Sequence, residues 1–187
     1  MPRQKTSDPE LFAALLQLFR EHGYEGASLS LISKATGLQR ASLYHRFPGG
    51  KHEMALTVLE HVHGQFGEDI LAPLAGQDSP ASRVRKVAKK IDEFYEGGRR
   101  PCLLDAMSLG GQTQDIKDAL AASMDGIADA FAQIAKEAGH PASTAKRLGQ
   151  DALVRLQGAL VVARVSGDCK SFQRVVRELP ELLTAAG

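Results

Sequence analysis

Hydrophobic residues recur every three or four positions along most of the chain, which is the spacing of one face of an α-helix. In residues 8–22, for example, Leu11, Leu15 and Leu18 form an apolar stripe, and Gly23 follows as a stop signal. Alternating runs of β-branched residues, which would indicate strands, are almost absent. The pattern predicts an all-α protein.

Breaks rich in glycine, proline and polar residues divide this pattern into about nine predicted helices. These helices cover approximately residues 8–22, 28–36, 40–47, 51–73, 80–95, 103–108, 113–138, 143–166 and 169–184. Three short helices therefore precede a larger helical bundle. We expect two domains, a small one over residues 1–51 and a larger one over residues 52–187.

The second and third predicted helices, SLSLISKATGLQRASLYHRF, meet at Gly37. A glycine there accepts a positive φ angle without a Cβ penalty, so two short helices can join at a sharp angle. Ile32, Leu38 and Leu43 fall on the inner side, where they can pack on the first helix. This arrangement predicts a helix-turn-helix, whose second helix enters the major groove of DNA.

Positive charge gathers in the same segment, although the net charge of the whole chain is only +1. Residues 34–51 contain four basic side chains and no acidic one, whereas residues 52–187 have a net charge of −2. A solvated surface is the alternative explanation for four cations on short helices. Together with the glycine turn and the hydrophobic register, however, the cluster favours neutralisation of DNA phosphates.

The bulk composition, 43% hydrophobic and 24% charged, is that of a soluble globular protein. The sequence contains no run of 18 apolar residues, which a membrane-spanning helix would need. The polar N-terminus does not have the pattern of a secretory signal. Cys102 and Cys169 lie far apart without metal-ligand spacing, so we expect reduced thiols in a cytoplasmic protein. Both are expected to be small buried residues, with a redox-sensing thiol as the alternative.

Signatures of enzymes are also missing from the sequence. We find no nucleophile elbow, phosphate-binding glycine loop or cluster of acids and bases, and therefore expect neither an enzyme nor a cofactor. His61 and His63 point to different faces of a helix, so no metal site is expected. A DNA-packaging protein without a ligand is a second alternative, but the large apolar C-terminal part favours a ligand-responsive regulator.

Residues 11–56 resemble the TetR family of bacterial transcriptional regulators, and GLQRASLYHRFPGGKHEM follows that family's signature. The FPGGK form of the signature and the later PCLLDAMSLGG are similar to the LmrA/YxaF-like subgroup. The resemblance implies a helix-turn-helix repressor with a C-terminal domain for ligand binding and dimerisation. Its partners would be double-stranded operator DNA, a small effector molecule and a second copy of the chain.

The resemblance also implies which side chains contact DNA. Those expected to face base edges are Gln39, Arg40, Ser42 and His45. Those expected to contact phosphates are Ser28, Tyr44 and Lys51. Arg3 and Lys5 are either a flexible arm that follows the DNA or a disordered tail, and Arg46 is a solvated cation in the simplest interpretation.

A homodimer is expected because one short recognition helix buries too little surface for specific DNA binding. The apolar faces of the last two predicted helices are the best candidates for the dimer interface. The residues chosen for it are Leu153, Leu156, Gly158, Leu160, Phe172, Val176 and Leu179. The alternative is that these residues form the core of a single chain.

The effector is expected to be a small, mainly apolar molecule, because the helical bundle contains few ionisable groups at obviously buried positions. The candidates for the ligand pocket, each of which could instead be core, are His63, Phe66, Phe94, Met107, Phe131 and Gln157. Gly64 and Gly67 each cost about 1 kcal/mol in a helix interior, which suggests a bend, close packing or a ligand against the backbone. The basic run RVRKVAKK (residues 83–90) is either a solvated face or a contact to nearby phosphate.

Overall fold

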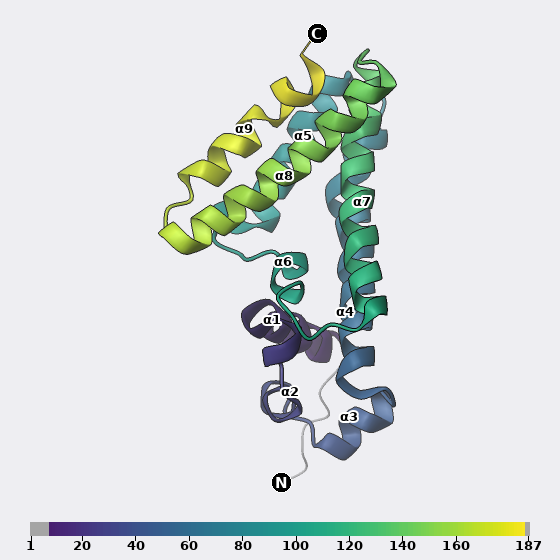
Figure 1. Ribbon diagram of the computed structural model, residues 1–187, viewed down its shortest axis with the longest axis vertical. Helices are drawn as coiled ribbons and strands as arrows, with labels where there is room; N and C mark the ends of the chain where they lie inside the picture. Colours follow the sequence, from purple (N-terminus) through teal and green to yellow (C-terminus); the bar gives the residue numbers. More distant parts are fainter. Residues whose placement is uncertain (1–7, 186–187) are drawn as a thin grey trace. The chain divides into compact units, whose positions relative to one another are not determined.

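The computed structural model describes residues 8–185, over which every regular element is a helix and no strand occurs (Figure 1). The predicted all-α class is confirmed. The α-helices are α1 (Asp8–Gly26), α2 (Leu29–Thr36), α3 (Arg40–Arg46), α4 (Gly50–Gln65), α5 (Pro80–Phe94), α6 (Leu103–Met107), α7 (Gln114–Glu137), α8 (Ala142–Ser166) and α9 (Lys170–Thr184). None of these described helices is both long enough and apolar enough to span a membrane.

The described chain forms two compact units. Unit 1 contains the residues up to Val62 together with Leu103–Leu120, and unit 2 contains His63–Cys102 and the residues from Ala121 onward. This grouping differs from the domain boundary expected after residue 51. That boundary was drawn where the DNA-binding motif ends in the sequence. Compactness follows packing instead, and α6 packs on α1 although the two helices are far apart in sequence.

The core of unit 1 is made of apolar side chains without exposed surface, among them Leu15, Phe19, Ile32, Leu43 and Met54. Gly23 lies outside the helical region, with φ 64° and ψ −174°, so the regular part of α1 ends where the sequence predicts. A Cβ at Gly23 would come within 2.6 Å of the Ala106 carbonyl oxygen. Glycine is therefore required both by the backbone angle and by the close approach of α6.

The long helix predicted over residues 51–73 changes its winding near its two glycines. After α4, the chain continues as a π-helical segment, η1 (Phe66–Leu71), and then as a 3₁₀ turn, η2 (Ala72–Ala75). A Cβ added at Gly64 or Gly67 would meet nothing within 4 Å, so close packing does not explain these glycines. The structure shows instead that the winding changes from α-helical to π-helical after Gln65, next to the two glycines.

Unit 2 is built from long helices that lie side by side. α8 and α9 run antiparallel around a turn at Gly167 (φ 70°), and α5 packs along α9 (Figure 1). α7 and α8 approach closely at Gly149, where a Cβ would lie 2.7 Å from the backbone nitrogen of Ala132 and still closer to the Ala128 carbonyl oxygen. Only glycine permits this distance between the two helix backbones.

A buried arginine also connects distant parts of unit 2. Arg83 is only 7% exposed, and its guanidinium donates to the Leu74 carbonyl at 2.5 Å and to the Glu137 carboxylate at 2.5 Å. The hydrogen bonds from Arg83 and Gln133 lower the pKa of Glu137, so the carboxylate stays ionised. Arg83 is thus a structural cation, and it does not belong to a solvated basic face.

Candidate DNA-binding site

Short-range hydrogen bonds hold the turn between α2 and α3. The Ser28 hydroxyl accepts from the Leu31 amide at 3.2 Å and caps the start of α2. Gly37 ends α2 in the left-handed conformation (φ 67°, ψ 5°), as its position predicts. The Ser33 hydroxyl donates to the Leu38 carbonyl at 2.5 Å, on the far side of this glycine. The sharp corner of the helix-turn-helix is therefore set by residues within ten positions of one another.

The recognition helix α3 turns one side inward and presents the other to solvent. Leu43 has no exposed surface, and Phe47 at its end is buried. The five candidates on or beside this helix are exposed: Gln39, Arg40, Ser42, Tyr44 and His45. The side chains proposed to read DNA are thus all accessible to solvent, and the two residues that anchor the helix are not.

Two arginines of α3 have partners that the sequence does not suggest. Arg40 donates to the Ser30 hydroxyl of α2 at 2.8 Å, which constrains part of its guanidinium and leaves further N–H groups for DNA. Arg46 forms an ion pair with Asp8 at 2.8 Å. The interpretation of Arg46 as a merely solvated cation is wrong. Arg3 and Lys5 lie outside the described residues.

The corner after α3 explains why glycine occupies position 50. Gly50 has φ 64°, and a Cβ there would lie 3.2 Å from the Tyr44 ring. Tyr44 therefore packs against the first residue of α4, while 46% of its surface remains exposed. This contact fixes the direction of the tyrosine hydroxyl relative to the start of α4.

Lys51, expected to contact phosphate, has interaction partners within the protein itself. Its ammonium donates to the Tyr24 carbonyl at 2.9 Å and lies 4.4 Å from the centre of the Tyr24 ring. A cation at the end of α1 satisfies a carbonyl that the helix leaves unpaired. Burial, and to a smaller extent the Asp115 carboxylate, raises the pKa of the Tyr24 hydroxyl. Lys51 therefore has a structural role at this corner.

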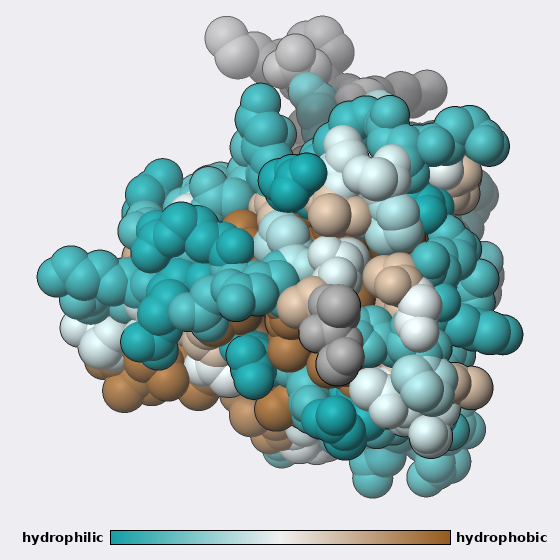
Figure 2. All heavy atoms as spheres, turned by 90° about the horizontal axis from the view of Figure 1, so that it is seen from above, coloured by the Kyte–Doolittle hydropathy of each residue, from teal (hydrophilic) through white to brown (hydrophobic). Residues whose placement is uncertain are grey.

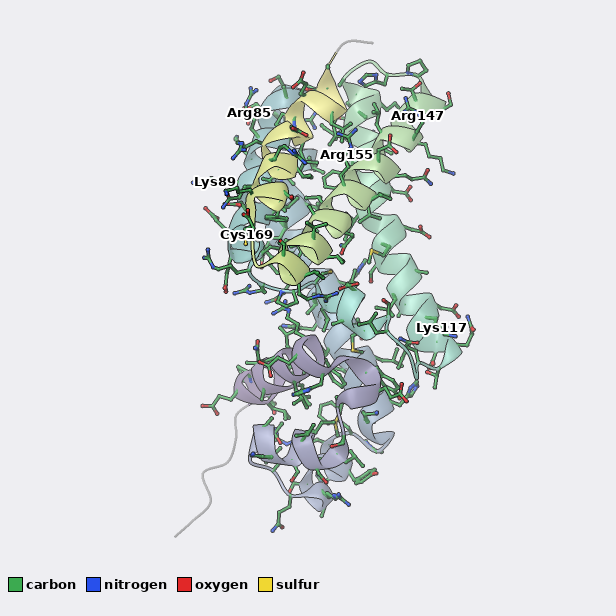
Figure 3. All side chains as sticks on the ribbon, turned by 60° about the vertical axis from the view of Figure 1, so that its left-hand side comes forward. Arg85, Lys89, Lys117, Arg147, Arg155 and Cys169 are labelled. Carbon is green, nitrogen blue, oxygen red and sulfur yellow. The ribbon has the colours of Figure 1, made fainter. Side chains whose placement is uncertain are left out.

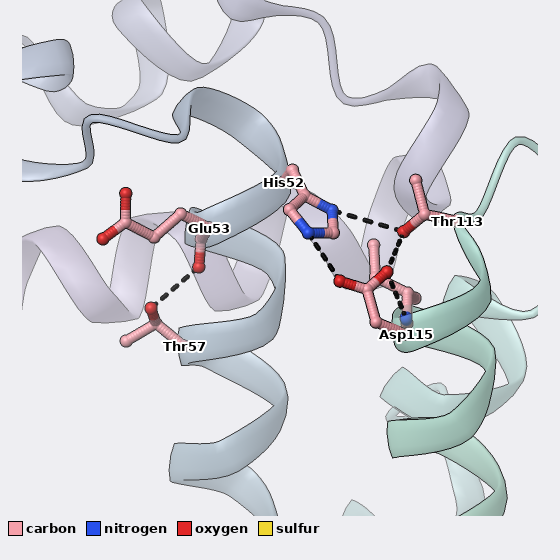
Figure 4. A network of polar contacts seen from close by, with 6 residues as sticks. His52, Glu53, Thr57, Thr113 and Asp115 are labelled. Carbon is pink, nitrogen blue, oxygen red and sulfur yellow. Dashed lines mark hydrogen bonds and ion pairs between the residues drawn. The ribbon is translucent and has the colours of Figure 1, made fainter.

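A polar network that sequence analysis missed joins α4 to the start of α7 (Figure 4). His52 contacts Asp115 with 2.7 Å between Nε2 and the carboxylate, and its Nδ1 lies 3.3 Å from the Thr113 hydroxyl. Hydrogen bonds from the Thr113 hydroxyl and the Ile116 amide, together with His52, lower the pKa of Asp115. No local signal predicts this network, since its members are about 60 positions apart.

Two comparisons with protein families agree with this geometry. The family described as "Bacterial regulatory proteins, tetR family" matches residues 11–58. The family described as "Transcriptional regulator LmrA/YxaF-like, C-terminal domain" matches residues 80–178, which is more than half of the chain. The chain belongs to the TetR family. It is a DNA-binding transcriptional regulator of the LmrA/YxaF-like group rather than an enzyme, and the family expectation is confirmed.

Individual relatives have the same extent as this TetR-family chain. The HTH-type transcriptional regulator LmrA of Bacillus subtilis is 22% identical over 183 residues, covering 95% of this chain and 96% of LmrA. A TetR regulator from Legionella pneumophila has the same fold, with a TM-score of 0.84, 17% identity, and coverage of 97% of this chain and 99% of that one.

Two further solved structures have the TetR fold together with a bound molecule. CifR, a cysteine mutant in complex with a 26-bp operator DNA, has a TM-score of 0.80 and 22% identity and covers 95% of this chain and 97% of its own. FadR of Bacillus subtilis, in complex with stearoyl-CoA, has a TM-score of 0.73 and 15% identity and covers 96% of this chain and 98% of its own.

The candidate effector residues of this regulator are not all brought together. Phe66 is buried and packs edge-on against Phe94, with ring centres 5.3 Å apart, and Phe131 is fully buried in the same unit 2. His63 is exposed, and Met107 is buried in unit 1 instead. Among the described residues, the buried Oε1 of Gln157 has no hydrogen-bond partner.

The candidate dimer residues divide into two groups. The larger group is buried within the single chain: Leu156, Leu160, Phe172, Val176 and Leu179. Leu153 is half-buried, and Gly158 is exposed. The intramolecular alternative therefore describes the buried five, because a side chain already covered by its own unit supplies little area to a second copy.

Proposed function

We propose that this TetR-family regulator represses transcription as a homodimer on a palindromic operator and is released by a small, mainly apolar effector. The observation that supports this most directly is the exposed side of α3, whose inner side is anchored by Leu43 and Phe47. A helix mounted in this way can enter the major groove without losing its packing. The operator complex of CifR, a protein of the same fold, agrees with this role.

Within this proposal, base recognition and phosphate contact fall to different side chains. Arg40 and Gln39 suit the major-groove edges of guanine and adenine, with Ser42 and His45 beside them. The Tyr44 hydroxyl and the start of α2 at Ser28 suit phosphates, which carry no sequence information. The ammonium group of Lys51, a residue of α4, lies at the end of α1 and would add positive charge near the phosphates from there.

The dimer contact is proposed on the exposed side of α8. Val154, Val162 and Val165 are 69%, 48% and 80% exposed, and with Gly158 they follow one another at intervals of three or four positions. Hydrophobic atoms also reach the surface along one side of the view in Figure 2. An apolar stripe with a glycine at its centre allows two copies of α8 to approach closely.

The effector is proposed to bind among the helices of unit 2. The rings of Phe66, Phe94 and Tyr95 form a connected aromatic cluster, which suits an apolar or aromatic molecule. The unpaired Gln157 oxygen would accept one hydrogen bond from it. The stearoyl-CoA complex of FadR is an example of ligand binding in a protein of this fold. Induction requires that the effector bind the DNA-free state more tightly.

The test is a binding selection with the full chain on random and genomic double-stranded DNA, which should enrich one palindrome. Arg40→Ala is expected to lower affinity for that palindrome about 10- to 100-fold and to change random-DNA binding much less. Tyr44→Phe should weaken both by a similar factor. Lys34→Gln, which removes an exposed cation of α2, serves as a control for loss of charge alone.

Two results would contradict the proposal. Enrichment of base composition without a palindrome would indicate a DNA-packaging protein. Equal losses on the palindrome and on random DNA for Arg40→Ala would remove Arg40 from the base-reading residues. The effector part is tested separately, by adding small molecules to the preformed DNA complex and measuring its dissociation.

A further inference from the structure

A surface groove of about 820 Å³ runs between α5 and α9 in unit 2. The residues of α5 that line it recur at helical spacing from Ala81 to Asp92, and the facing stripe of α9 runs from Gln173 to Thr184. Twelve residues of α-helix, at a rise of about 1.5 Å per residue, span about 16 Å from first to last, which sets the length of the groove. Its volume is within the range of small-molecule sites. The groove exists partly because Ala81 and Ala88 are too short to fill it.

Three cations line this groove. Arg85 and Lys89 stand one turn apart on α5, beside α9 (Figure 3), and Arg177 projects from the α9 wall. Neither Arg85 nor Arg177 forms a hydrogen bond or ion pair within the described part of the chain, and Lys89 has only an exposed contact with Glu93 at 3.7 Å. Two guanidinium groups on opposite walls are therefore available to one anion.

The floor of the groove is apolar. Val176 and Ala88 are buried there, and Pro180 is half-buried. Asp92 and Glu181 also line the groove, which disfavours a ligand with negative charge along its whole length. The combination suits a molecule that carries one anionic group on an apolar body.

The groove is separate from the proposed effector site, because none of the candidate effector residues lines it. It also accounts for the basic run of residues 83–90. Arg83 points inward to Glu137, Lys86 pairs with Asp78, and Arg85 and Lys89 reach the groove. The run is therefore not a uniformly solvated face.

We propose that the α5–α9 groove is a binding site for an amphiphilic organic anion, a carboxylate or phosphate on a linear apolar chain. The head group would lie between Arg85 and Arg177, because the planar fork of arginine matches both kinds of oxyanion. The chain would lie along Ala88, Val176 and Pro180. This site does not depend on whether the protein represses transcription.

The experiment is calorimetric titration of the full-length protein with decanoate and decyl phosphate, each below its micelle-forming concentration. Decanol tests the apolar chain alone, and acetate tests the head group alone. Binding of either decyl anion, with no detectable binding of decanol or acetate, is expected. The stronger of the two anions identifies the preferred head group.

Two variants assign the binding to the groove. Arg85→Gln and Arg177→Gln are each expected to weaken the binding about tenfold, because each removes a charged hydrogen-bond donor. Arg174→Gln is the matched control, since Arg174 is an exposed arginine of α9 outside the groove. Ala88→Leu, which fills the floor, should also weaken the binding, and its fold is checked by circular dichroism.

Unchanged affinity in both Arg85→Gln and Arg177→Gln would overturn the proposal, as would equal binding of decanol. If Ala88→Leu fails to fold, the two exposed arginine variants still decide the matter. Operator binding by the same preparations is measured in parallel. Loss of the proposed repressor function therefore appears as absent DNA binding, whereas failure of this site appears only in the anion titration.

Discussion

The two compact units of this regulator are stabilised in different ways. In unit 1, the corner that presents α3 depends on bonds between near neighbours, such as Ser28 with Leu31 and Ser33 with Leu38. In unit 2, helices meet through residues far apart in sequence, as Arg83 does with Glu137. A DNA-reading unit specified by local rules can be recognised in a single sequence. A bundle specified by distant contacts cannot be recognised in the same way.

The largest expected effect tests the distant contacts of unit 2. Gly149→Ala places a methyl group against the backbone of α7, so α7 and α8 must separate. We expect the free energy of unfolding to fall by about 3 kcal/mol, measured by urea denaturation at fixed protein concentration. Gly64→Ala is the control and should raise stability by about 0.5–1 kcal/mol, because nothing lies within 4 Å of its Cβ. Similar effects of the two changes would contradict the assigned contact.

The second effect concerns the buried arginine of unit 2. Arg83→Met leaves the Leu74 carbonyl without its donor, and we expect a loss of about 2 kcal/mol in the same denaturation experiment. The pKa of Glu137, followed by NMR, should rise towards its ordinary value at the same time. Lys86→Met removes only an exposed pair with Asp78 and should cost much less stability than Arg83→Met. If Arg83→Met lost as little stability as Lys86→Met, Arg83 would be dispensable for the fold.

The third-largest effect tests the short-range hydrogen bonds that hold unit 1. Ser28→Ala removes the cap of α2 and should lower stability by about 1 kcal/mol, measured by thermal unfolding. Ser30→Ala, two positions later, removes no cap and should leave stability nearly unchanged. Because the two serines are close neighbours on one helix, equal destabilisation would argue against the capping role.

The smallest effect lies in one of the distant contacts of unit 1, between His52 and Asp115. The folded-state pKa of Asp115 is lowered, so the carboxylate stabilises unit 1 above its unfolded pKa of about 4, and this contribution is lost as pH falls through the folded value. The difference in melting temperature between the wild type and Asp115→Asn should therefore be present at neutral pH and shrink towards pH 3. Asp125→Asn, at an exposed position of α7, should show no such trend.

Sequence periodicity predicted most of the fold. Most helix bounds and the left-handed Gly37 agree with the structure because each depends on residues within one or two turns. The helix predicted over residues 51–73 is the exception, since its winding changes after Gln65. The DNA-contact candidates on α3 came from the family resemblance, and the structure leaves them exposed while Leu43 faces inward. The hydrogen-bond partners of Lys51, Arg40 and His52 could not be predicted from the sequence, because these partners lie on other helices.

The sequence by itself determined the all-helical class, the helix-turn-helix and its concentration of positive charge. Only the tertiary structure decided which apolar faces are already covered. Leu156 and Leu160 face the core of unit 2, whereas Val154 and Val162 on the same helix face solvent. Helical spacing reveals that a face is apolar, but both kinds of face follow the same 3.6-residue period. Whether the same chain or a second molecule covers a face depends on packing between distant helices, which no local pattern encodes.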